Sequence, residues 1–199
     1  GDRAFSAGAD IHEMTQLSSR DLALRGEAAD RACWHLANCR LPMIGALNGL
    51  TFGSGAVIAS SMDIRIGCER TKFRFLAASY GRVNSTWTLP LVVGWPMAKE
   101  LLFTAREVDP DEATRIGLLN HVVPVEQLVQ YAVEIGHAIA KNDRRMVQGT
   151  KRLLHEGLER GYRERYLLEK QARASDLKET PPEQGFKVFL DRKRARPIK

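Results

Sequence analysis

Cysteine is scarce in this chain and shows no pairing pattern. The three cysteines, Cys33, Cys39 and Cys68, are odd in number and form no CxxC motif. Disulfide frameworks and zinc sites need even or closely spaced sets of cysteines, so neither is expected. The histidines also lack metal-ligand spacing. We expect reduced thiols and no metal site.

Long apolar runs are also missing. No stretch approaches the roughly 20 apolar residues that cross a bilayer. Residues 1–10 lack the charged-then-apolar layout of a secretory signal. We therefore expect a soluble, cytoplasmic protein that does not associate with membranes. The 199 residues, 44% hydrophobic and 27% charged, have the composition of one globular domain.

Positive charge is in modest excess. Thirty Lys and Arg against 24 Asp and Glu give a formal net charge of +6, which favours an anionic partner. The sequence offers no aromatic stacking platform or recognised nucleic-acid-binding module, so nucleic acid is not the expected partner. A basic run near the C-terminal end is either a solvated segment or a phosphate contact. Its members are Arg192, Lys193, Arg194, Arg196 and Lys199.

The apolar pattern predicts an α/β fold. Apolar residues recur at helical spacing over residues 21–36. Short apolar runs predict buried strands at residues 43–47 and 63–68, separated by a turn and by a small-residue helix at residues 53–61. The order strand, turn, helix, strand is typical of α/β proteins.

The second half of the chain is predicted to be mainly helical. Asp109 is placed as an N-cap, Pro110 as the first helical residue, and Glu112 where its side chain could reach back to the cap. Gly117 is expected to end that helix. A strand at residues 118–123 and amphipathic helices at residues 125–141 and 144–177 should follow.

Two glycine-rich segments are the candidate site. They are residues 5–11 (FSAGADI) and residues 48–55 (NGLTFGSG). Small residues let another group approach the backbone closely, and a helix beginning at the second segment would present free N–H groups to an anion or oxyanion. Alternatively, the small residues only permit tight packing between a strand and a helix.

Taken together, these segments resemble the crotonase (enoyl-CoA hydratase/isomerase) family. The resemblance covers AFSAGADIHEM and LPMIGALNGLTFGSGAVIASSMDIRIG in the first half of the chain. It continues through AKELLFTAREVDPDEATRIGLLNHVVP and SDLKETPPEQGFKVFLDRKRARP in the second half. Several independent motifs therefore occur in the family's order. Family members carry a further segment before these motifs, so we expect the N-terminal part to be lacking.

The resemblance implies a spiral of ββα units followed by a helical region that forms trimers, often hexamers as dimers of trimers. On this basis we assign residues 1–125 to a crotonase-like core. Residues 126–199 are assigned to the helical C-terminal trimerisation region of the same domain. The implied partners are an acyl-CoA thioester and further copies of the chain. No cofactor is implied, because coenzyme A is part of the substrate.

The family's shared device is an oxyanion hole made by two backbone N–H groups. Carried over to this sequence, the donors are those of Ala9 and Ser54. In the hydratases two glutamates move protons, and the matching positions here hold Val57 and Ala77. Neither hydrocarbon side chain can act as an acid or base, so ordinary hydration is disfavoured.

A polar loop replaces the family's next glycine-rich stretch. Asn84 falls near a position where some decarboxylases of the family have a polar catalytic side chain, and Ser85 and Thr86 could orient water or a carboxylate. Alternatively, these side chains only satisfy their own backbone in a turn. Tyr80 and Trp87 flank the loop and could line the acyl pocket with Val57 and Ala77, or pack in the core.

The resemblance also suggests residues that contact coenzyme A. In the first glycine-rich segment and directly after it they are Ala7, Gly8, Asp10 and His12, although Asp10 is usually structural in the family. Near the C-terminal end they are Phe189 and Arg192.

Two functions fit these residues. The first is an acyl-CoA enzyme, a lyase or isomerase of fatty acid metabolism, that stabilises a thioester enolate during isomerisation, decarboxylation or atypical hydration. The second is a non-catalytic acyl-CoA binding or carrier protein that keeps the fold without the chemistry.

Overall fold

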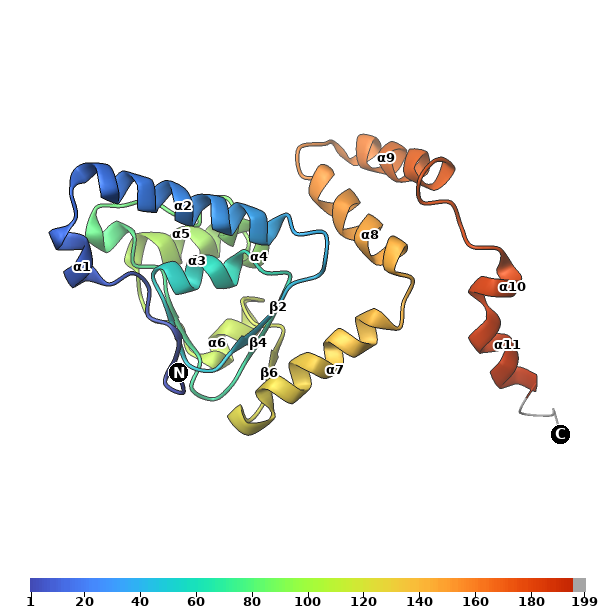
Figure 1. Ribbon diagram of the computed structural model, residues 1–199, viewed down its shortest axis with the longest axis horizontal. Coiled ribbons are helices and arrows are strands. Elements are labelled where there is room, and N and C mark those ends of the chain that lie inside the picture. Colours follow the sequence, from blue (N-terminus) through green and yellow to red (C-terminus); the bar gives the residue numbers. More distant parts are fainter. Residues whose placement is uncertain (195–199) are drawn as a thin grey trace. The chain divides into compact units, whose positions relative to one another are not determined.

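Short parallel strands in two separate sheets organise the first part of the chain (Figure 1). The computed structural model describes the backbone of residues 1–194 and their side chains except those of residues 188 and 192–194. One sheet has the order β1-β3-β5 and the other the order β2-β4-β6. The strands are β1 (Ala4–Ser6), β2 (Ile44–Leu47), β3 (Leu50–Phe52), β4 (Ile64–Gly67), β5 (Lys72–Arg74) and β6 (His121–Val122).

Each turn of the chain adds one strand to each sheet. Ile44 to Leu47 of β2 pair in register with Ile64 to Gly67 of β4, and Leu50 to Phe52 of β3 pair with Lys72 to Arg74 of β5. Helix α3 (Ser54–Ser60) follows β2 and β3 in the chain and leads to β4 and β5. This repeated ββα arrangement confirms the expected spiral and the α/β class.

Eleven α-helices and two 3-10 turns occur within residues 1–194. The first unit also contains α1 (Ile11–Gln16), α2 (Ser19–Ala37), η1 (Ala78–Tyr80), α4 (Leu89–Val93), α5 (Trp95–Thr104), α6 (Pro110–Arg115), η2 (Val125–Gln127) and α7 (Leu128–Ala140). The second unit contains α8 (Arg144–Glu156), α9 (Tyr162–Ala174), α10 (Pro182–Gly185) and α11 (Lys187–Arg194). The first unit spans Gly1–Asn142 and the second Asp143–Lys199. Within residues 1–194, no helix is long and apolar enough to cross a membrane.

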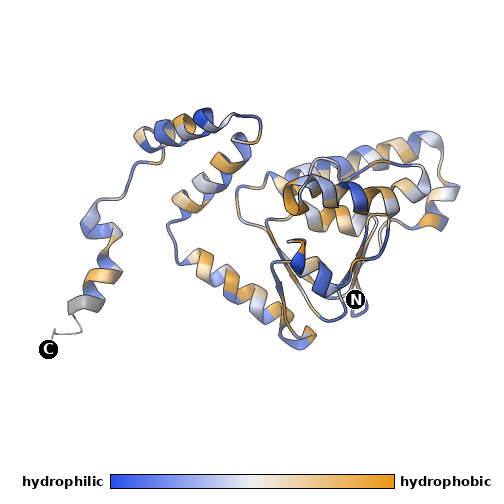
Figure 2. Ribbon diagram, turned by 180° about the vertical axis from the view of Figure 1, so that it is seen from behind, coloured by the Kyte–Doolittle hydropathy of each residue, from blue (hydrophilic) through white to orange (hydrophobic). Residues whose placement is uncertain are grey.

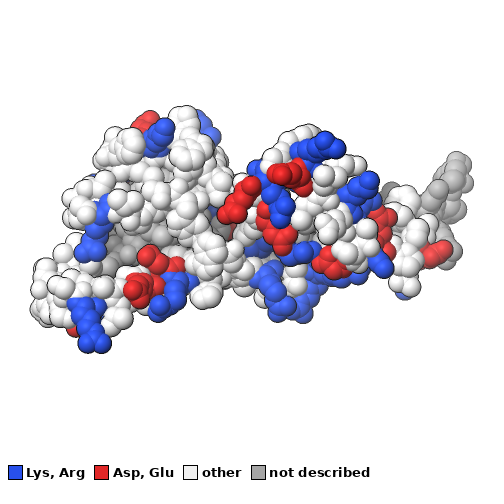
Figure 3. Space-filling view, turned by 90° about the horizontal axis from the view of Figure 1, so that it is seen from above, with Lys and Arg blue, Asp and Glu red and all other residues white. Residues whose placement is uncertain are grey.

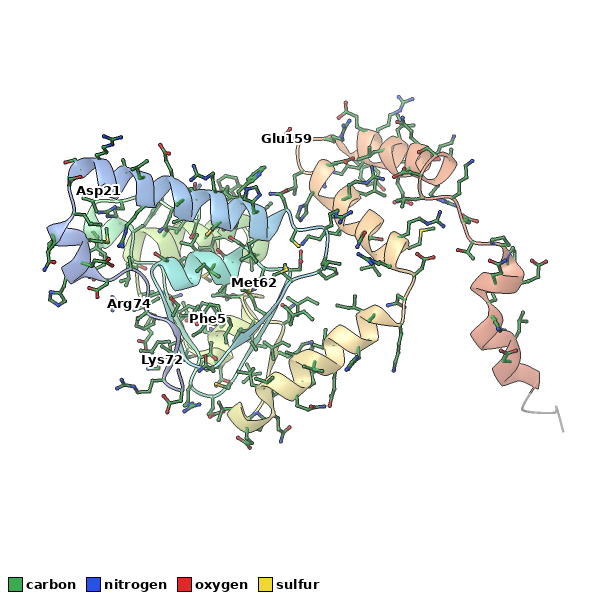
Figure 4. All side chains as sticks on the ribbon, viewed as in Figure 1. Phe5, Asp21, Met62, Lys72, Arg74 and Glu159 are labelled. Atoms are coloured by element: carbon green, nitrogen blue, oxygen red, sulfur yellow. The ribbon has the colours of Figure 1, made fainter. Side chains whose placement is uncertain are left out.

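The core of the first unit lies between its strands and helices. Phe73 and Phe75 are buried with Leu47 of β2 and Leu101 of α5. Phe5, labelled in Figure 4, packs against this cluster from β1. Helix α7 alternates apolar and polar residues along its length (Figure 2) and contacts β2 and β4. The core thus fixes α3 and the loops beside it.

The second unit is held together by local contacts. Helices α8 and α9 pack together, and the buried Leu177 lies against Gly149 of α8, where an added Cβ would come within 2.5 Å of the Leu177 methyl carbons. An ion pair of 2.6 Å joins Arg152 and Asp176. The helix expected over residues 144–177 is wrong as one element, because residues 157–161 separate α8 from α9.

The other predicted boundaries are mostly confirmed. Asp109 accepts a hydrogen bond from the Glu112 N–H as the N-cap, and Gly117 has a φ of +78° just after the helix. The Glu112 side chain does not reach back to the cap. It forms two hydrogen bonds of 2.7 Å with the Arg106 guanidinium instead. The strand expected over residues 118–123 is shorter, His121–Val122, because the Leu119 N–H donates to the carbonyl of Ala113 on α6 at 2.9 Å rather than to a strand.

Thr71 provides a test of the links between strands. Its hydroxyl is buried, donates to the Leu47 carbonyl at 2.6 Å and accepts from the Cys68 N–H at 2.8 Å. Thr71→Val leaves both backbone groups unpaired, so we expect the free energy of unfolding to fall by about 2 kcal/mol or more in urea titrations. Thr71→Ser keeps the hydroxyl and should lose less. Equal losses in the two variants would contradict this role.

Glu112 provides a test of pH dependence. The Arg106 hydrogen bonds lower the pKa of Glu112 below its usual value, so this contact stabilises the fold above pH 4.5 and is lost as pH falls through the lowered pKa. At pH 7 we expect Glu112→Gln to reduce the free energy of unfolding by about 1 kcal/mol. The difference should shrink towards pH 3. A pH-independent loss in Glu112→Gln would refute the assignment.

Candidate active site

Strand pairing brings the two glycine-rich segments together. Ala4 of β1 pairs with Leu50 of β3, and Ser6 with Thr51, in parallel. Since neighbouring parallel strands run in the same direction, the segments that follow them leave from the same edge of the sheet. Residues 7–10 therefore lie beside residues 53–55.

The backbones of these segments approach too closely for side chains at some positions. A Cβ added at Gly55 would lie 2.3 Å from the Ser6 carbonyl oxygen. A Cβ at Gly8 would lie 3.1 Å from the Phe52 carbonyl oxygen and 3.2 Å from the Ser54 nitrogen. Gly8 also has a φ of +98°, which L-residues rarely adopt. The glycines thus permit tight packing between a strand and a helix, which was the alternative interpretation of these segments. The same packing places Gly8 beside the Ser54 N–H.

The two N–H groups expected to form the oxyanion hole have no acceptor within the described part of the chain. Neighbouring groups are engaged: the Gly8 N–H donates to Ser6 Oγ at 3.3 Å, and the Gly53 N–H donates to the Arg74 carbonyl at 3.0 Å. Ala9 and Ser54 are both exposed. Their amides are therefore available to a bound carbonyl oxygen.

The carboxylates next to Ala9 have structural partners. Asp10 Oδ1 accepts hydrogen bonds from the N–H groups of His12 (2.9 Å) and Glu13 (3.2 Å), which caps α1. Glu13 pairs with Arg25 at 2.5 Å, and this hydrogen bond lowers the pKa of Glu13. His12 is exposed at the start of α1. Both carboxylates are thus occupied in holding the loop and helix.

Hydrocarbon occupies the positions matched to the family's glutamates. Val57 lies half-buried on α3, one turn after Ser54, and its carbonyl oxygen accepts the hydroxyl protons of Ser60 and Ser61. Ala77 is buried just before η1. Neither side chain supplies a proton donor or acceptor.

The polar loop has unpaired buried groups. Asn84 Oδ1 and Ser85 Oγ are buried and have no hydrogen-bond partner within residues 1–194. Ser85 is fully buried with a φ of +58°, whereas Thr86 is exposed. The alternative in which these side chains satisfy their own backbone does not hold for Asn84 Oδ1 and Ser85 Oγ.

Aromatic residues flank the loop at the surface. Tyr80 is 57% exposed and Trp87 is 42% exposed, so neither belongs to the closed core. The Trp87 ring lies 5.8 Å from that of Trp34 on α2, tilted by 45°. Trp34 was missed in the sequence. It could have been noticed as a large aromatic residue outside the apolar face predicted for residues 21–36.

The C-terminal candidates belong to the second unit. Phe189 lies on α11 and is 65% exposed, whereas the Arg192 side chain lies outside the described residues. Residues 143–199 contain 16 Lys and Arg and nine Asp and Glu, so the whole positive excess of the chain resides there. Figure 3 shows many Lys and Arg, intermixed with Asp and Glu, on the second unit, and broad uncharged areas on the face of the first unit that it displays. No group of three or more His, Cys, Asp or Glu in the described part of the chain could hold a metal ion.

Comparisons with known proteins identify the family. A family model described as enoyl-CoA hydratase/isomerase matches residues 1–196. The chain is 35% identical over 162 residues to a short-chain-enoyl-CoA hydratase of Clostridium acetobutylicum, covering 80% of this chain and 62% of that protein. It is 31% identical over 198 residues to a crotonyl-CoA hydratase of Syntrophomonas wolfei, covering 98% and 76%.

A solved structure shows the same fold. The crystal structure of an enoyl-CoA hydratase from Bacillus anthracis superposes with a TM-score of 0.90 at 27% identity, covering 96% of this chain and 76% of that one. The chain thus spans 62% to 76% of the length of these three relatives. The chain therefore belongs to the enoyl-CoA hydratase/isomerase, or crotonase, family, and its spiral of strands and its glycine loops after β1 and β3 agree with this.

Proposed function

We propose that this chain is an acyl-CoA-processing enzyme that stabilises a thioester enolate in an oxyanion hole. The proposal rests mainly on the N–H groups of Ala9 and Ser54, which lie on adjacent glycine-containing loops and have no acceptor in the part of the chain that the structure describes. As an enolate forms, negative charge moves onto the thioester oxygen. Main-chain donors already aimed at that oxygen would lower the barrier, and each is worth about 10² to 10³ in rate.

The reaction we propose is isomerisation or decarboxylation, or else a hydration that uses other groups. Val57 and Ala77 cannot transfer protons, and each positioned acid or base contributes about 10² to 10⁴. Decarboxylation of a malonyl-type thioester needs no strong base, because the electrons of the breaking C–C bond flow into the thioester carbonyl as CO₂ leaves. The oxyanion hole stabilises the resulting enolate, which then takes a proton at its α carbon.

Coenzyme A would lie along the first glycine-rich loop. Ala7 and Gly8 leave room at the backbone, while Asp10 and His12 stand at the start of α1. Phe189 and Arg192 remain proposed contacts to the CoA portion. Tyr80, Trp87, Val57 and Ala77 would line the acyl pocket, with Asn84, Ser85 and Thr86 as its polar side.

A second candidate is a non-catalytic acyl-CoA binding protein. The hydrocarbon side chains of Val57 and Ala77 favour it, because binding needs the oxyanion donors but no acid or base.

For either function we also propose that the chain forms trimers or hexamers and acts in fatty acid metabolism. A cytoplasmic location is also a proposal, since one relative, at 30% identity, is a mitochondrial enoyl-CoA hydratase of Pongo abelii.

Turnover and binding measured together separate the two candidates. We expect the protein to bind enoyl-CoA and malonyl-type thioesters in calorimetry and to turn over at least one of them. Hydration of crotonyl-CoA should be slower by about 10² or more than in a family member that carries the glutamates, because both proton-transfer groups are replaced. Binding without turnover of any thioester would select the carrier. Absence of binding would reject both.

Gly8→Ala tests the oxyanion hole. The added methyl would lie 3.2 Å from the Ser54 nitrogen in a backbone conformation unfavourable for alanine. We expect kcat to fall by about 10² or more through disturbed donor geometry. The matched control is Gly26→Ala on α2, where an added Cβ meets nothing within 4 Å. It should keep full activity and gain about 0.5 to 1 kcal/mol of stability. A folded Gly8→Ala enzyme with unchanged kcat would argue against the proposed site.

A further inference from the structure

Two adjacent residues of the polar loop, Asn84 and Ser85, each have a buried side-chain oxygen without a hydrogen-bond partner in residues 1–194. Asn84 Oδ1 and Ser85 Oγ are both buried without a partner in the described part of the chain, and Ser85 is 0% exposed. A buried polar atom left unpaired costs about 1 to 3 kcal/mol, and most such atoms in folded proteins have partners. Residues that only closed a turn would be more stable without these groups.

The backbone conformation of Ser85 is also energetically unfavourable. Its φ of +58° lies in the left-handed region, where glycine, asparagine and aspartate are the usual residues. Glycine would adopt this conformation freely but would bring no hydroxyl. A serine there keeps both the backbone conformation and a buried hydroxyl that the chain itself does not use. Such local strain clusters at ligand-binding positions.

The loop is attached to the far end of the helix that begins at the oxyanion donor. Thr88 Oγ1 and Ser60 Oγ are joined by a buried hydrogen bond of 2.9 Å, and the Leu89 N–H donates to the Ser85 carbonyl at 3.0 Å. Ser60 is the last residue of α3 and Ser54 the first. At 1.5 Å per residue, the attachment lies about 9 Å along the helix from the Ser54 end. That length suits an acyl chain running from the thioester to the loop.

The unpaired atoms define the chemistry of the group they would bind. Asn84 Oδ1 can only accept a hydrogen bond, whereas Ser85 Oγ can donate or accept. A hydroxyl group also donates one hydrogen bond and accepts others, so it would satisfy both atoms. An ionised carboxylate would face Asn84 Oδ1 with a second acceptor, and an alkyl chain would leave both atoms unpaired.

From these observations we infer that Asn84 and Ser85 recognise an uncharged hydroxyl on the acyl group, well beyond the thioester carbon. This inference rests on the proposed function and narrows its substrate class to hydroxylated acyl-CoA thioesters. Asn84 and Ser85 are then specificity-determining residues, and the reaction at the α carbon depends on the N–H groups of Ala9 and Ser54.

Matched thioesters test the inference. The probes are hexanoyl-CoA and hexanoyl-CoA carrying a hydroxyl on its fourth, fifth or sixth carbon, with affinity measured by calorimetry. We expect at least one hydroxylated probe to bind the wild-type protein about tenfold more tightly than hexanoyl-CoA. Ser85→Ala and Asn84→Ala should remove this preference, so that each variant binds the hydroxylated probes no more tightly than it binds hexanoyl-CoA. The exposed Ser79→Ala is the matched control and should keep it.

Unfolding without ligand supplies an independent readout. Because the Ser85 hydroxyl is unpaired, Ser85→Ala should leave the thermal midpoint unchanged or raise it. A lower midpoint would show that the hydroxyl serves the fold and would overturn the inference. Equal binding of all four thioesters to the wild type would also overturn it, while leaving the proposed function intact. Failure to bind any CoA thioester would instead reject the proposed function, and this inference with it.

Discussion

The contact between the backbones of β1 and α3 is the constraint on which the site depends. An added Cβ at Gly55 would lie within 2.3 Å of the Ser6 carbonyl, so the beginning of α3 can reach β1 only as glycine. The parallel pairing of β1 with β3 sets the direction of both loops, and Gly8 and Gly53 turn them with positive φ angles. Within residues 1–194 the N–H groups of Ala9 and Ser54 have no acceptor, whereas those of their neighbours Gly8 and Gly53 are engaged.

Polar groups elsewhere in the interior of the first unit show what a structural role looks like. Thr71 bridges two backbone groups. Arg65 is only 5% exposed, and burial lowers its pKa, yet its guanidinium donates to the carbonyls of Leu118 and Met62. Asn84 Oδ1 and Ser85 Oγ differ because no such partner serves them within residues 1–194. This contrast supports a role in ligand binding, rather than in stabilising the fold, for the side chains of this loop.

Sequence reasoning succeeded where a local rule decides the structure. Asp109 and Gly117 mark the ends of α6 through capping chemistry, and the two glycine-rich segments lie side by side. It failed where a distant partner competes: Arg106 draws Glu112 away from the helix cap. The burial of Ser85 and the pairing of Trp34 with Trp87 could not be predicted either, since both depend on how the loop packs in three dimensions.

The two units also differ in how their contacts are spread along the chain. In the second unit, α8 and α9 are neighbours in sequence and pack on each other. In the first unit, the N–H of Arg65 on β4 donates a hydrogen bond to Asn120 Oδ1 just before β6, and these residues are 55 positions apart in sequence. Closing a loop of this length lowers the conformational entropy of the chain before the stabilising contacts form. Native structure is therefore expected to form later in the first unit, which contains Ala9 and Ser54, than in the helices of the second unit.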